Sequence, residues 1–100
     1  MKKYRVTPRA RDDLKSIARY TQHQWGKLQR DKYLKLLEQR FEWIGENPLS
    51  GKNRNDICAG YYSFPHGEHL VFYRLGAGVI DVIGVLHQDM DVEYYFNTWH

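Results

Sequence analysis

Apolar residues recur at helical spacing through the first part of the chain. Residues 3–7 alternate and contain β-formers, so they predict a short strand. Thr7 and Pro8 then mark a helix start, because the threonine hydroxyl can cap free backbone N–H groups and proline fits the first turn. Gly26 predicts the end of this helix. The apolar stripe between these signals, in which we expect Leu14 and Ile17 to enter the core, consists of Ala10, Leu14, Ile17, Ala18 and Trp25.

A second stripe predicts a helix over about 28–46. Because Gly26 and Lys27 alone separate it from the first helix, we expect the two helices to fold back on each other as a hairpin. An Asn-Pro pair then stops the helix, and residues 49–53 predict a loop. The apolar positions of this second stripe are Tyr33, Leu34, Leu37, Phe41 and Ile44.

The chain after Arg54 has the pattern of strands. Alternation and β-formers predict three of them, separated by turn residues. The last is apolar on both faces apart from Asp81 and Gly84, which predicts an inner position in the sheet. The predicted strands cover 56–64, 70–75 and 79–86, with turns at 65–67 and 76–78 and a helical turn at 87–91.

The predicted order is therefore β-α-α-β-β-β, an α+β fold. It consists of an N-terminal strand, a helical hairpin and a three-stranded antiparallel meander, with the first strand at an edge or in the middle of the sheet. A chain of 100 residues fits one domain, 1–100. We expect the hairpin to cover one sheet face incompletely and to leave a groove that can bind a partner.

Composition adds a mild basic character. The formal net charge is +3, from fifteen Lys and Arg against twelve Asp and Glu. This predicts either a solvated basic face or a docking surface for an acidic protein segment or DNA. The cations that crowd the start of the chain are Lys2, Lys3, Arg5, Arg9, Arg11 and Lys15.

Cys58 is the single cysteine, which excludes an internal disulfide and suits a reducing compartment. Its neighbours Ile57 and Ala59 predict a buried thiol. No signal peptide or membrane-length apolar run is recognisable, so we expect a cytoplasmic protein without a membrane partner.

Aromatic rings are abundant, and rings with a polar end suit protein interfaces. Tyr20 and Trp25 are candidates for a partly open groove along the first helix. Tyr73 and the aromatic residues of the C-terminal tail are further candidates for partner contacts. The tail contains Tyr94, Tyr95, Phe96 and Trp99.

Five segments in this order resemble the RelE/ParE toxin superfamily, and within it the ParE branch. The most specific is 86–91, Leu-His-Gln-Asp-Met-Asp, which is similar to the His-x-x-Met-Asp ending of ParE-like toxins. The others are Tyr4–Pro8 followed by Ala10, Asp13 and Leu14; Glu46–Lys52; Gly60 and Tyr61; and His69–Arg74.

The resemblance implies a toxin of a type II toxin–antitoxin system. ParE-like toxins trap DNA gyrase with cleaved DNA, and a cognate antitoxin neutralises them by laying a segment along the hairpin and sheet. The implied partners are thus an antitoxin, DNA gyrase and, through gyrase, DNA, without a cofactor. Candidate antitoxin contacts are Tyr20, Trp25 and Tyr73, and candidate target contacts are Arg74, His87, Met90 and Asp91.

The sister branch of the superfamily cuts mRNA on the ribosome, which requires an acid, a base and cations around the phosphate. Residues 60–64 contain no cation, and His69 and Gln88 stand where that branch has an arginine and a tyrosine. We therefore expect no enzyme activity. If the protein were a nuclease, the candidate catalytic residues would be His69, Arg74 and His87, with charge from Lys52.

A third hypothesis for the function is a binding module that has kept the fold without toxicity.

The histidines also have a purely structural interpretation. His87 lies at the end of a strand, and we expect its ring to bond to the backbone. The five histidines show no metal-ligand spacing, so no metal site is predicted, and 76–78 is a hairpin turn, not a nucleotide loop.

Overall fold

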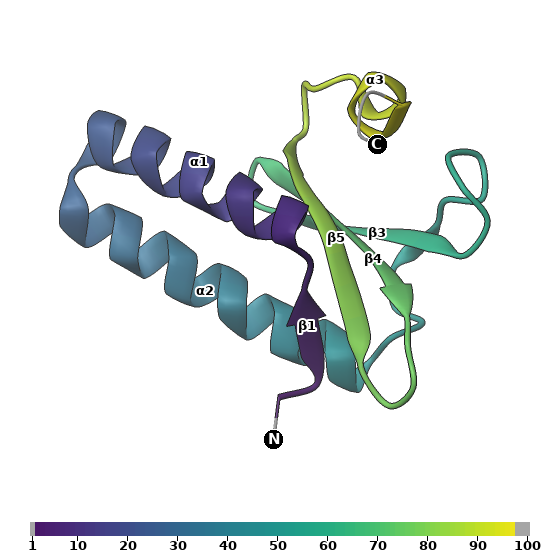
Figure 1. Ribbon diagram of the computed structural model, residues 1–100. Coiled ribbons are helices and arrows are strands. Elements are labelled where there is room, and N and C mark those ends of the chain that lie inside the picture. The colour runs from purple at the N-terminus through teal and green to yellow at the C-terminus, as the bar shows by residue number, and fades with distance from the viewer. Residues whose placement is uncertain (1, 98–100) are drawn as a thin grey trace.

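A computed structural model of the protein describes residues 2–97 and confirms the helical hairpin (Figure 1). Strand β1 (Tyr4–Val6) leads into α1 (Pro8–Trp25), which is followed by α2 (Lys27–Glu46). The Thr7 hydroxyl accepts from the Ala10 N–H at 3.3 Å, as a helix cap should. Gly26 joins the helices with a φ of 93°, a conformation that favours glycine. No helix in this range is both long and apolar enough to cross a membrane.

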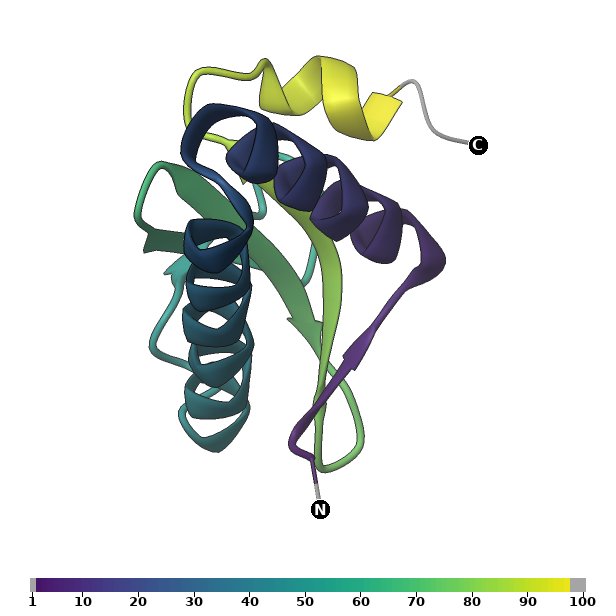
Figure 2. The same cartoon turned by 90° about the vertical axis from the view of Figure 1, so that its left-hand side faces the viewer.

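The sheet has the strand order β1-β5-β4-β3-β2. Strands β3, β4 and β5 form the predicted antiparallel meander, and β1 lies at one edge, parallel to β5. The hairpin packs against one side of the sheet, as Figures 1 and 2 show. The remaining elements are β2 (Lys52–Asn53), β3 (Tyr61–His66), β4 (His69–Leu75), β5 (Ile80–His87) and α3 (Val92–Asn97).

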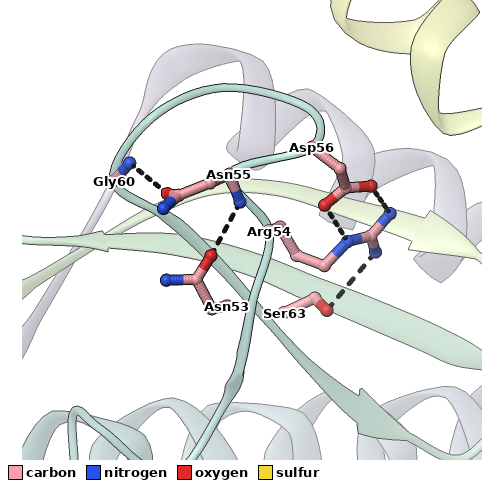
Figure 3. A network of polar contacts seen from close by, with 6 residues as sticks. All are labelled: Asn53, Arg54, Asn55, Asp56, Gly60 and Ser63. Carbon is pink, nitrogen blue, oxygen red and sulfur yellow. Dashed lines mark hydrogen bonds and ion pairs between the residues drawn. The ribbon is translucent and has the colours of Figure 1, made fainter.

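The strand predicted over 56–64 is wrong in its first half, because side chains fold residues 54–60 into a loop (Figure 3). Arg54 makes two contacts with the Asp56 carboxylate, at 3.1 and 3.2 Å. The Asn55 side-chain oxygen accepts from the Gly60 N–H at 3.0 Å. Such local bonds compete with strand pairing. The loop also leaves Cys58 exposed, so the expected burial of its thiol is wrong.

The strand ends differ from the prediction in two further places. Strand β3 continues through Pro65 and His66, which the sequence assigned to a turn. Proline is tolerated there because the short β2 pairs only with Ser63 and Tyr62, which leaves this part of β3 at the sheet edge. Strand β2 itself lies inside the segment predicted as a loop. Residues 88–90 form a turn after β5, and a short helix, α3, follows.

An irregularity in β5 divides its apolar residues between two layers. Phe72 pairs with Gly84 and Tyr73 pairs with Val82, so Ile83 is an extra residue between them. Val82 and Val85 consequently face the hairpin, whereas Ile83 faces the other side. The hairpin-side core also contains Ile17, Leu37, Phe41, Ile44 and Val71, with Leu14 partly buried against it; the other cluster contains Phe72, Leu86 and Tyr95.

The outer edge of β5 has two successive partners. Strand β1 pairs only as far as Val82, where the chain turns away into α1. Farther along, the Val85 N–H donates to the Asp13 carboxylate at 3.0 Å. The Tyr95 hydroxyl donates to the same oxygen at 2.5 Å. Asp13 therefore ties α1, β5 and α3 together.

Tyr95 fits this place because Gly84 lies beneath its ring. A Cβ on Gly84 would stand 2.9 Å from the Tyr95 hydroxyl oxygen, closer than packing allows. Arg9 stacks on the Tyr95 ring at 3.5 Å and donates to its backbone carbonyl. Burial raises the pKa of Tyr95, and so does its bond to Asp13. Burial likewise raises the pKa of Asp13, against the effect of its two donors.

We predict that Tyr95→Phe lowers the free energy of unfolding by about 1–3 kcal/mol at neutral pH, since Asp13 loses a donor. The folded pKa of Tyr95 is raised, so its contribution is complete below the unfolded pKa of about 10 and is lost as pH rises through the folded pKa. Urea unfolding at neutral and alkaline pH should show the two proteins converging at high pH. Tyr20→Phe, on the exposed face of α1, is the control. An equal effect of both variants would contradict a stabilising role for the bond between Tyr95 and Asp13.

Candidate functional site

A groove runs along the hairpin side of the sheet, between α1 and the ends of β4 and β5. It has a volume of about 530 Å³. A second hollow of about 440 Å³ shares Tyr20, His69 and His87 with it and continues to Ile17 and Met90. We call the two hollows together the helix–sheet groove. The residues that line its larger part are Tyr20, Thr21, Trp25, Gln29, Tyr33, Gly67, Glu68, His69 and His87.

Large apolar side chains stand exposed in this groove. Tyr20 is 62% exposed, Trp25 71% and Met90 48%. Tyr20 and Trp25 lie on the last turns of α1, and Met90 lies in the turn after β5. Exposed apolar residues gathered around one concavity are typical of a surface that binds another protein.

Two histidines form the polar floor of the groove. His69 and His87 pair across β4 and β5, with ring centroids 5.6 Å apart and planes nearly perpendicular. The Tyr33 hydroxyl lies 2.7 Å from Nδ1 of His69. Nδ1 of His87 accepts from the Asp89 N–H at 3.1 Å, which confirms the expected backbone bond of this ring. Because Nδ1 accepts this bond, Nε2 carries a proton, and it lies 3.7 Å from the Glu68 carboxylate.

The electrostatics of the floor disfavour a charged His69. Burial lowers the pKa of His69, and the neighbouring His87 and His66 lower it further, against the opposing effect of Glu68. Burial also lowers the pKa of His66. A phosphate transition state needs positive charge, and a neutral imidazole supplies none.

The three residues considered for RNA cleavage do not converge. His69 and His87 lie on the hairpin side of the sheet, in the helix–sheet groove. Arg74 follows Tyr73, which faces the hairpin-side core, so its side chain points to the opposite face. There Arg74 lines a separate cleft and lies 3.8 Å from Asp81.

The predicted target contacts are divided in the same way. His87 and Met90 share the helix–sheet groove, whereas Arg74 lies on the opposite face. The Asp91 side chain accepts from the Tyr94 N–H at 3.0 Å and so begins α3. These four residues do not form one surface.

Tyr73 is placed in the core, so its prediction as an antitoxin contact is wrong. Its side chain is 0% exposed. Its hydroxyl donates to the Pro48 carbonyl at 2.8 Å and accepts from the Gly51 N–H at 3.0 Å. Tyr73 therefore fastens the loop after α2 to the sheet, a role that a strand pattern alone does not reveal.

The C-terminal aromatic residues have separate positions. Tyr95 is buried and Phe96 packs on Phe72 at 5.1 Å, while Tyr94 is exposed. Trp99 lies outside the described residues. Tyr33 and Glu68 belong to the groove but were not singled out from the sequence; Tyr33 appeared there only as a member of the apolar stripe of α2. Within residues 2–97, no group of three or more His, Cys, Asp and Glu side chains could hold a metal ion.

Comparison with known proteins gives consistent matches over almost the whole chain. Residues 4–92 match the model of the ParE toxin of type II toxin-antitoxin systems, parDE. The chain is 41% identical over 91 residues to Toxin ParE1 of Caulobacter vibrioides, covering 91% of this chain and 94% of that protein. It is 38% identical over 92 residues to Toxin ParE1 of Mycobacterium tuberculosis, with 91% and 94% covered. Identity to Toxin ParE of Escherichia coli is 32% over 96 residues, with 92% and 90% covered.

A solved structure shows the same fold. A chain from the chromosomal ParDE TA system of P. aeruginosa matches with a TM-score of 0.72 and 15% sequence identity. The match covers 87% of this chain and 96% of that chain. The strand, helical hairpin and sheet inferred from the sequence are thus an architecture that a distant sequence also adopts.

We predict that the His69 imidazole titrates below its usual pKa of about 6.5, because burial and His87 disfavour the charged ring. Its contribution to stability is then complete above pH 6.5 and is lost as pH falls through the folded pKa. An NMR titration of the ring protons measures the midpoint. In His87→Gln the neighbouring charge is absent, so the midpoint of His69 should rise. A wild-type midpoint at or above 6.5 would contradict this description of the groove floor.

Proposed function

Since the chain belongs to the ParE toxin family of type II toxin–antitoxin systems, we propose that it poisons DNA gyrase and is held inactive by a cognate antitoxin. The resemblance to ParE-like toxins implies both the target and the mode of control. Trapping of gyrase with cleaved DNA is the expected outcome. The proposal also requires a cytoplasmic location, where gyrase and DNA are accessible.

The observation that carries the proposal is the family match over residues 4–92. A second observation supports it: the residues that mRNA cleavage would need do not lie together. His69 and His87 share the groove, but Arg74 is on the other face of the sheet. Strand β3 brings no lysine or arginine to their side. This arrangement supports a toxin that acts by binding, without catalysis of its own.

The adjacent histidine rings are the one observation that favours the nuclease alternative. Two imidazoles at 5.6 Å could serve as acid and base. In that case ribosome-bound mRNA would be cut, and His87→Ala or Arg74→Ala would abolish cutting. A chain that neither cuts mRNA nor slows growth would instead be a binding module of this fold.

We predict that the purified protein inhibits supercoiling by DNA gyrase and increases the fraction of linear DNA recovered after denaturation of the enzyme. The physical reason is that a trapped cleavage complex leaves both strands broken. Gel electrophoresis of plasmid DNA measures both effects, with protein unfolded by heat as control. Normal supercoiling without linear DNA, at protein in excess over gyrase, would refute the proposed target.

We also propose that the antitoxin lays an apolar segment in the helix–sheet groove. Two of the antitoxin contacts predicted from the sequence, Tyr20 and Trp25, line this groove and are exposed. Aromatic anchors in a concave surface contribute a large share of the binding free energy in protein interfaces. A coupled-folding segment would bury well over about 1,000 Å² in total.

We predict that Trp25→Ala weakens antitoxin binding by at least about 10-fold without changing the unfolding midpoint, because its ring is exposed in the free toxin. Isothermal titration with the protein encoded by the adjacent reading frame measures the affinity. Leu49→Ala is the matched control, since Leu49 is equally exposed but lies outside the groove. Equal affinity of Trp25→Ala and wild type would remove the groove as the antitoxin site.

A further inference from the structure

A row of charged residues crosses the sheet on the face opposite the hairpin. Arg5 pairs with Asp81 across β1 and β5, and Asp81 pairs with Arg74 across β5 and β4. Arg74 pairs in turn with Tyr61 of β3. Directly paired residues share a sheet face, and the neighbours of Arg5 along β1 enter the hairpin-side core. The side chains of this arginine row therefore point away from the hairpin.

Asp81 contacts the Nε atom of both arginines. Its Oδ1 lies 2.9 Å from Nε of Arg5, and its Oδ2 lies 3.8 Å from Nε of Arg74. The Asp81 side chain is 18% exposed, whereas Arg5 is 65% and Arg74 55% exposed. Within residues 2–97, these Nε atoms make the ion pairs of both guanidinium groups, and their terminal nitrogens have no hydrogen-bond acceptor.

The row thus presents a net positive charge with free donors. The two guanidinium groups carry two positive charges, and the Asp81 carboxylate supplies a single negative charge. Asp81 is also the most buried of the three side chains. Planar guanidinium groups bind phosphate oxygens through paired N–H donors. Arg5 and Arg74 stand two strands apart, about 10 Å, so an extended chain of anions can contact both.

A cleft beside the row adds to its attraction for anions. It has a volume of about 380 Å³ and lies between Arg74 and the start of α1. Arg9 lines it, and although its guanidinium is stacked on Tyr95, its charge still faces the same space. The positive end of the α1 dipole, at Thr7 and Pro8, lines the cleft as well.

We propose that the arginine row binds the phosphate backbone of DNA directly. The two faces of the sheet differ in the chemistry that they offer. Exposed Tyr20, Trp25 and Met90 make the helix–sheet groove suitable for a protein segment. The row offers guanidinium donors, the chemistry that positions proteins on phosphodiester backbones. An acidic protein segment is the competing ligand that the experiment must separate from DNA.

The inference rests on the proposed function in one respect: the gyrase cleavage complex would be the source of the DNA. Direct contact of the toxin with that DNA would hold the broken duplex and the enzyme in one assembly. Binding to DNA alone can be measured without gyrase, so failure of the inference and failure of the proposed target remain distinct.

The test is fluorescence anisotropy with a short labelled DNA duplex over a series of salt concentrations. Binding by the wild-type protein should weaken steeply as salt rises, because phosphate contacts release counterions. Arg5→Gln and Arg74→Gln should each weaken binding several-fold and reduce the slope of log K against log salt by about 1. Lys35→Gln removes the same charge from the hairpin, on the other side of the sheet, and should bind nearly as wild type.

Two further variants exclude a folding defect. Arg5→Lys and Arg74→Lys keep the charge but lose the planar pair of donors, so their affinities should lie between wild type and the glutamine variants. Unchanged circular dichroism and unfolding midpoints are expected, since both side chains are more than half exposed. An equal loss of DNA affinity in Lys35→Gln would overturn the assignment, because it would indicate a diffuse charge effect.

Two other results would also overturn it. One is a wild-type protein that shows no salt-sensitive DNA binding at low salt. The other is a pair of glutamine variants that bind DNA normally but lose affinity for gyrase or for the antitoxin, which would make the row a protein contact. Inhibition of gyrase is measured in a separate assay. A wild-type protein that binds DNA through the row but leaves gyrase unaffected would support the inference and refute the proposed target.

Discussion

The structure depends on how the outer edge of β5 obtains hydrogen bonds. This strand is buried on both faces, yet β1 pairs with it only as far as Val82. The chain then leaves the sheet to begin α1, and the Asp13 side chain supplies the acceptor that the backbone of Val85 requires. An unpaired buried N–H is costly, so this bond fixes the path of α1 along β5. The place of α2, and with it the helix–sheet groove, follows from that path.

The same strand separates two surfaces of different chemistry. The extra residue at Ile83 lets β5 contribute apolar side chains to both layers without a change of direction. On the hairpin side, the strand ends at His87 and the groove with its exposed aromatic rings. On the other side, Asp81 gathers Arg5 and Arg74. The sheet therefore keeps the two proposed binding surfaces on opposite faces of the molecule.

Much of this could be predicted where the sequence pattern has a physical period. The stripes of both helices, their Thr7 and Gly26 boundaries and the meander all follow from spacing that local geometry enforces. The loop at 54–60 could not be predicted in this way, because Arg54 and Asn55 choose local partners over strand pairing. Cys58 is exposed for that reason.

The errors in the site have a different origin. Alternation along β4 already places His69 and Arg74, five positions apart, on opposite faces, so the strand pattern itself argues against one site that contains both. The role of Tyr73 could not be predicted from the strand pattern, because its hydroxyl bonds to the Pro48 carbonyl, 25 positions away. The two-layer role of β5 likewise requires knowledge of the register with β4. Contacts between distant segments carry information that no local pattern contains.

The pairing of β1 with β5 also governs when the molecule can act. Tyr4 finds its partner, Ile80, only after nearly the whole chain has been made, whereas the helical hairpin contains contacts that can form early during synthesis. The floor of the groove and the arginine row both draw on β4 and β5, so neither exists on a nascent chain that has not passed residue 80. A ribosome that stalls before this point therefore holds a chain in which neither surface has formed, so synthesis must be almost complete before the protein can bind any partner through them.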